Sequence, residues 1–131
     1  MSQPDDDRFV DTDEIRLSLP ALFAYGRVAR LAVTGLASRS GYSYDDVEDL
    51  RIAVGELFGL LVAEERPDDL LRLTCALHPD SLEILAETLP AKAIDQVPQL
   101  SRQILAAVVD DAAIDPTIGQ IRIVKRLRTN A

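Results

Sequence analysis

The sequence predicts an α/β protein, a two-layer α/β sandwich in which helices cover one face of a mixed, mostly antiparallel sheet. The chain has 131 residues, of which 47% are hydrophobic, and this suits one domain with one core. Alternating apolar residues predict strands near both ends and in the middle of the chain, while spacings of three and four residues predict helices between them. Elements in this order bury their apolar faces as two layers.

The N-terminal residues set the domain boundary. Residues 1–12 are polar and rich in Asp, so we expect a disordered acidic leader followed by a single domain over residues 13–131. Such a leader is the opposite of a signal peptide, and no apolar run approaches the roughly 20 residues of a membrane span. Cys75 is the only cysteine, which excludes an internal disulfide. We therefore expect a cytoplasmic protein that does not bind membranes.

The first strand and the first helix follow one another directly. Ile15, Leu17 and Leu19 alternate with polar residues and predict a half-buried strand that ends at Pro20. Apolar residues then recur at helical spacing over residues 21–38.

A second helix is predicted over residues 44–65. Ser43 or Tyr44 begins it, because acidic residues follow and favour the positive end of a helix. Pro67 lies beyond its end. The apolar stripe that we expect to face the sheet consists of Val47, Leu50, Val54, Leu57, Phe58 and Leu61.

The second half of the chain predicts a hairpin, a loop, a helix and a last strand. The hairpin strands span residues 71–77 and 82–88, on either side of the turn residues in "HPDS". A loop covers residues 89–98, which contain two prolines and show no clean period. A helix follows over residues 101–112. The last strand, over residues 118–127, is expected at an edge of the sheet, guarded by its Lys and Arg residues.

The charge balance opposes nucleic acid as a partner. Fourteen Lys and Arg against twenty-two Asp and Glu give a net charge of -8, which repels a phosphate backbone. The basic run "IRIVKRLRTN" is better explained as a solvated strand. His78 is the only histidine, and without a second His or Cys at ligand spacing we expect no metal site.

The stretch "DDVEDLRIAVGELFGLLV" resembles the signature helix of the GHKL ATP-binding fold, in the version found in bacterial anti-sigma-factor serine kinases. The likeness extends over most of the chain, including the Ala29 and Arg30 pair of the first helix and the closing helix and strand. It implies a histidine-kinase-like ATPase domain, a homodimer, and a sigma factor or an anti-sigma-factor antagonist as partner. The residues of the helix that match in place are Asp49, Leu50, Arg51, Ala53, Val54 and Glu56.

The resemblance also implies a site, from which this sequence departs. In the family a helix Glu is the general base, and an Asn four residues later holds the magnesium of ATP. Glu56 matches the base, but the later position is Leu60, which has no oxygen for a hard cation. The family's Asp-x-Gly-x-Gly motif is absent, since no glycine lies between Gly59 and Gly119. Asp95 is the only acid of the loop and thus the candidate for nucleotide contact.

These departures predict a regulatory protein with a degenerate nucleotide site. We expect Glu56 to be a vestigial general base and ATP and magnesium binding to be lost. If Leu60 and the loop over residues 89–98 fill the space, Leu60 should pack against that loop, with no nucleotide-sized pocket beside Glu56. Arg27 and Arg30 are the candidate contacts with the sigma factor or antagonist. Two alternatives stay open: an active serine/threonine protein kinase that phosphorylates an antagonist protein, and a dimerising scaffold for an active homologue.

Overall fold

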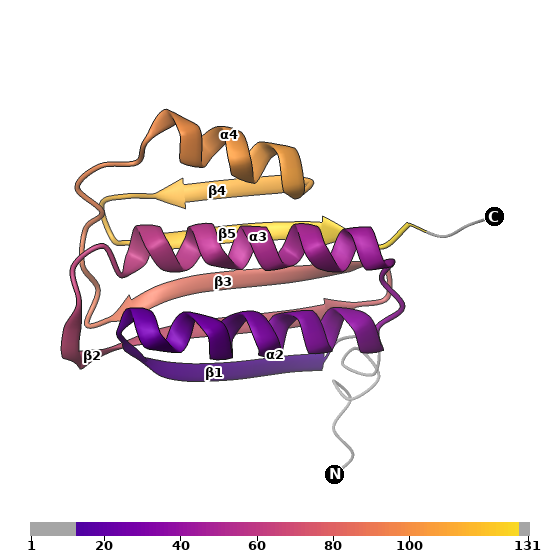
Figure 1. Ribbon diagram of the computed structural model, residues 1–131, viewed down its shortest axis with the longest axis horizontal. Coiled ribbons are helices and arrows are strands. Elements are labelled where there is room, and N and C mark those ends of the chain that lie inside the picture. Colours follow the sequence, from indigo (N-terminus) through magenta and orange to yellow (C-terminus); the bar gives the residue numbers. More distant parts are fainter. Residues whose placement is uncertain (1–12, 129–131) are drawn as a thin grey trace, which may run out of the picture.

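The computed structural model describes residues 13–128, which form a five-stranded sheet with helices on one face (Figure 1). The predicted α/β fold is confirmed, whereas the predicted leader lies outside the described residues. The strands are β1 (Asp13–Ala21), β2 (Arg66–His78), β3 (Ser81–Leu89), β4 (Asp111–Asp115) and β5 (Gln120–Arg126). The helices are the short 3-10 helix η1 (Phe23–Tyr25) and the α-helices α2 (Gly26–Arg39), α3 (Tyr44–Leu61) and α4 (Gln99–Val108).

The strands lie in the order β1-β2-β3-β5-β4, and every neighbouring pair is antiparallel. The hairpin of β2 and β3 is confirmed, with His78 opposite Ser81 at its turn. The last strand, β5, lies between β3 and β4, so the prediction that it forms an edge is wrong. The edges of the sheet are β1 and β4.

The strand β4 is the element that the sequence pattern did not predict. The helix predicted over residues 101–112 ends at Val108, and Val109 already has extended backbone, with φ -129° and ψ 163°. Ala112 therefore lies in β4, paired with Ile123, rather than on a helix. Leu100, in the first turn of α4, is 65% exposed. The face of α4 that is buried instead carries Ser101, Leu105 and Val108.

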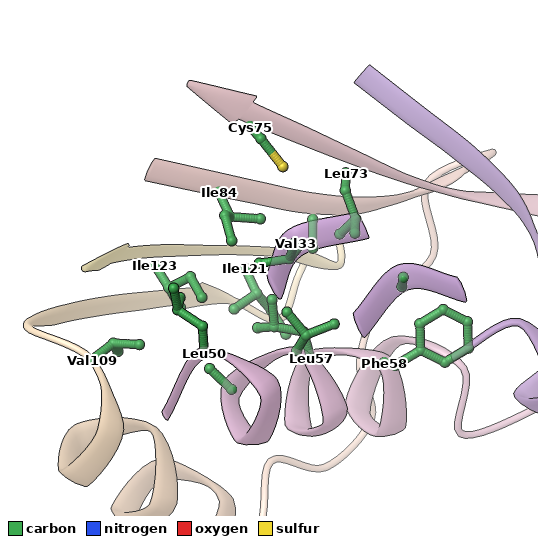
Figure 2. Close-up of a cluster of buried hydrophobic side chains, with 14 of the residues drawn as sticks. Val33, Leu50, Leu57, Phe58, Leu73, Cys75, Ile84, Val109, Ile121 and Ile123 are labelled. Atoms are coloured by element: carbon green, nitrogen blue, oxygen red, sulfur yellow. The ribbon is translucent and has the colours of Figure 1, made fainter. Parts of the chain in front are cut away.

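The core lies between the sheet and the helices α2 and α3. Figure 2 shows Leu73 and Ile84 on their strands, pointing towards Leu50 and Leu57 on α3. Each such fully buried side chain stabilises the fold by about 1.5–3 kcal/mol relative to an exposed one. The predicted stripe of α3 is buried as expected, except that Leu61 is only half-buried.

Local sequence explains both ends of α3. At its start, the Ser43 hydroxyl accepts a hydrogen bond from the Asp46 N–H at 3.1 Å, so Ser43 is the cap. Its end is at Leu61, four residues before the predicted one, because β2 begins at Arg66 and pairs there with Ala21. No helix among residues 13–128 is long and apolar enough to cross a membrane.

A buried lysine joins β5 to two helices. The Nζ atom of Lys125 lies 3.0 Å from Asp49 and 3.5 Å from Asp46 on α3, and it donates to the carbonyl of Val108 at 2.7 Å. The Tyr42 hydroxyl donates to the Lys125 carbonyl at 2.7 Å. Burial raises the pKa of Tyr42 to about 12, so this hydroxyl remains a donor at neutral pH. Lys125 is thus a buried residue that holds α3 and α4 to β5, rather than a solvated residue at the edge of the sheet.

Candidate ligand pocket beside Glu56

A cavity of ≈ 890 Å³ opens beside the C-terminal half of α3. Its walls come from α3, the segment between α3 and β2, the ends of β1 and β3, the loop over residues 90–98 and the first turn of α4. This volume lies within the range of about 300–1,000 Å³ that is typical of small-molecule pockets. The prediction that Leu60 and the loop close this space is wrong.

The pocket stays open because the loop is held by the turn between β4 and β5. The Ile94 N–H donates to the Pro116 carbonyl at 2.8 Å, and the Lys92 N–H donates to the Thr88 hydroxyl at 3.2 Å. Gly119 has φ +66° and approaches the loop so closely that a Cβ there would lie 1.9 Å from the Lys92 carbonyl oxygen. The loop therefore rests on the turn and leaves the space above α3 free.

The structure brings the predicted nucleotide-site residues together. Glu56 is half-buried, and Asp95 is exposed on the loop; both line the pocket. Leu60 also lines it, although its side chain is only 8% exposed because it turns towards the core. Sequence reasoning missed Thr88 and Lys92. The signal for Thr88 was its place on the inward face at the end of a predicted strand.

The charges of the pocket are unbalanced. Four carboxylates and two cations line it, which leaves two negative charges. Both cations are paired with acids of the pocket: Arg66 with Glu64, and Lys92 with Asp69 at 3.5 Å. Among residues 13–128, no hydrogen bond or ion pair is found for the remaining two carboxylates, Glu56 and Asp95.

These residues do not fit the magnesium–ATP that the fold implies. Leu60 stands where a metal-binding side chain is needed, and the described part of the chain has no group of three His, Cys, Asp or Glu side chains that could hold a metal ion. The loop has no glycine to let backbone approach phosphates, and the surplus of carboxylates repels them. We therefore derive no phosphoryl-transfer step for this pocket.

The predicted partner contacts lie outside the pocket, on α2. Arg27 is exposed, as a contact residue must be. Arg30 is half-buried, and its Nη1 atom lies in the space beside Gly26 and Gly55, between α2 and α3. It is therefore less accessible to a partner than Arg27 is. Sequence reasoning missed the exposed apolar side chains around Arg27; we call the set of Phe23, Arg27, Val28 and Leu31 the α2 surface.

Comparison with known proteins gives a consistent result. The chain is 36% identical over 76 residues to the serine-protein kinase RsbW of Bacillus cereus (strain B4264), covering 56% of this chain and 48% of that relative. It is 35% identical over 75 residues to the protein of the same name from Bacillus mycoides (strain KBAB4), covering 56% and 47%. The chain thus spans about half the length of the curated relatives it matches. No family model matches.

A solved structure has the same fold. It is the crystal structure of the RsbU and RsbW domains of Rv1364c from Mycobacterium tuberculosis, with a TM-score of 0.62 at 16% identity. The match covers 88% of this chain and 32% of that one. About half of the chain is thus similar in sequence to serine-protein kinases named RsbW, and its fold is shared with the solved RsbU and RsbW domain structure.

Proposed function

We propose that this chain is an anti-sigma-factor-like regulator that binds a sigma factor or an anti-sigma-factor antagonist in the cytoplasm and has a degenerate nucleotide site. The observation that carries the binding role is the α2 surface. Leu31 is 67% exposed and Phe23 is 54% exposed, next to the exposed Arg27. Exposed apolar side chains with an arginine among them are typical of the centre of a protein interface.

The overall charge supports such a partner. The net charge of -8 favours an encounter with a basic protein, and sigma factors present basic surfaces that read DNA. Nucleic acid itself is not part of the proposal. By kinship with the RsbW kinases the chain is also proposed to form a homodimer, so light scattering should give twice the chain mass of 14.4 kDa.

Capture of purified partners tests the α2 surface. The immobilised chain is offered each sigma factor and each antagonist of its host, one at a time. We expect Arg27→Ala to weaken binding about tenfold and Leu31→Glu to abolish it, because hot-spot residues are central and apolar. Arg102→Ala is the matched control, since Arg102 is also an exposed helix arginine but lies on α4. Unchanged binding by both α2 variants would show that the contact lies elsewhere.

An active serine/threonine kinase is the second candidate, and the open pocket with Glu56 on its wall favours it. Under the degenerate-site proposal Glu56 is vestigial, because Leu60 supplies no metal ligand. Calorimetry with magnesium–ATP separates the two. We expect no heat of binding from the regulator, whereas tight binding that Glu56→Ala abolishes would establish the kinase instead.

A further inference from the structure

The pocket beside Glu56 has the wrong charge for a triphosphate, yet it remains open. We propose that it binds a small organic cation, an amine or guanidinium compound with an apolar body, in place of magnesium–ATP. This inference rests on the proposed degenerate site and gives that site a ligand class.

The first support is the arrangement of charge. Arg66 and Lys92 are each paired with an acid of the pocket, so their positive charges are offset within it. Glu56 lines the cavity from α3 and Asp95 lines it from the loop, so two uncompensated carboxylates belong to its wall. Their fields add in the cavity, and the pocket attracts a positive ligand.

The helix ends around the pocket do not reverse this sign. The last turn of α3 has no basic residue, and its carbonyl end, with about half a negative charge, lies at the pocket beside Leu61. The first turn of α4 brings the opposite pole, about half a positive charge, near Ser101. These two poles offset each other, and the two carboxylates decide the net potential.

The second support is the apolar part of the wall. Leu60 and Leu61 contribute from α3, and Ile94 and Pro98 contribute from the loop. Apolar walls with a few placed charges are the usual form of a small-molecule site, where the charges fix the orientation of the ligand. A purely hydrophilic cation would leave these side chains without contact, so the ligand class includes an apolar body.

Titration followed by amide NMR tests the ligand class on the full chain. Phenethylamine is the cationic probe, and phenethyl alcohol is the uncharged probe of nearly the same shape. We expect saturable shifts for amides of the pocket with the amine, and binding of the alcohol about tenfold weaker, as expected for the loss of one charge interaction. Magnesium–ATP is titrated in parallel and should not occupy the pocket.

Two isosteric variants test the residues. Glu56→Gln and Asp95→Asn should each weaken amine binding several-fold, whereas Asp45→Asn should not, since Asp45 is an exposed acid of the same helix α3 outside the pocket. The amide spectrum of each variant reports whether it is folded. No saturable shift with the amine, equal binding of the alcohol, or unchanged binding by both pocket variants would overturn the proposal.

The failure of this inference can be told from that of the proposed function. Tight binding of magnesium–ATP would overturn both the cation preference and the degenerate site. A chain that captures no sigma factor or antagonist, but still binds the amine in a Glu56-dependent way, would overturn only the partner proposal.

Discussion

Lys125 connects three parts of the fold because its ammonium group has acceptors on α3 and at the end of α4. A buried ammonium is tolerated only when charge and hydrogen bonds compensate its lost hydration. Asp49 and Asp46 supply the charge, and the Val108 carbonyl supplies a neutral acceptor. Asp49, which matches the signature helix of the family, therefore has a structural role here.

Replacing this lysine measures that role. We expect Lys125→Met to lower the free energy of unfolding by about 2 kcal/mol. This loss is smaller than is usual for a broken buried ion pair, because both carboxylates can partly rehydrate. Arg16→Met is the control, since the exposed pair of Arg16 with Glu14 contributes under about 1 kcal/mol. Urea denaturation gives the free energy of unfolding of both variants. Equal losses of stability in the two would contradict the role of Lys125 in holding the helices to the sheet.

Asp110 gives the fold a dependence on pH. Burial raises the pKa of Asp110, but hydrogen bonds from the Arg126 N–H at 2.7 Å and the Arg128 guanidinium at 2.6 Å outweigh it, so the pKa lies below its ordinary value. The folded state thus prefers the carboxylate. This stabilisation is present above the unfolded pKa of about 3.9 and is lost as the pH falls through the lower folded pKa.

The pH dependence is tested with an isosteric change. Asp110→Asn should be less stable than the parent at pH values near neutral, and the difference should shrink as the pH falls below about 4. Urea denaturation at several pH values measures it. Asp68→Asn, at an exposed acid on β2, should show no such trend. A difference between parent and Asp110→Asn that persists in acid would show that charge is not the cause.

At the scale of elements, α3 was the easiest to predict and β4 the hardest. The stripe of α3 repeats over eighteen residues, and its Ser43 cap has a local signal. The five residues of β4 carry two alanines, which suit a helix or a strand, and only pairing with β5 decides between them. The open pocket could likewise not be predicted from the sequence, because the course of the loop depends on Gly119, which is distant from the loop along the chain.

Gly119 allows a test of how the loop is held. Gly119→Ala should lower the free energy of unfolding by about 3 kcal/mol. The added Cβ would collide with the Lys92 carbonyl oxygen, and an alanine would also be strained at the positive φ of this position. Gly41→Ala is the matched control: Gly41 has φ +92° but open space around it, so about 1 kcal/mol of backbone strain is expected alone. Hydrogen exchange at the Ile94 amide should accelerate only in the Gly119 variant. Equal losses in both variants would exclude the close contact.

Over the whole molecule, charges of opposite sign are paired on the open face of the sheet, while the net charge stays negative. Arg72 and Gln120 both donate to Glu87 across three strands, and Arg122 pairs with Glu83. These pairs neutralise one another locally and keep that face solvated. The remaining acidic excess acts at longer range and should steer a basic partner.

The association rate with the captured partner tests this steering. Raising the salt from about 50 mM to about 500 mM should slow association about tenfold, since it shortens the Debye length. The dissociation rate should change less, because it depends on contacts already formed. Surface plasmon resonance or stopped flow separates the two rates. An association rate that does not depend on salt would show that long-range electrostatic attraction does not contribute to recognition.

The walls of the pocket come from segments that are far apart along the chain, between Ala21 and Ser101. A molecule bound there therefore acts as a reversible cross-link that is present only in the folded state. At a concentration one hundred times its dissociation constant, such a molecule adds about 2.7 kcal/mol to the free energy of unfolding. The melting temperature of this small fold would then report how much of that molecule is present.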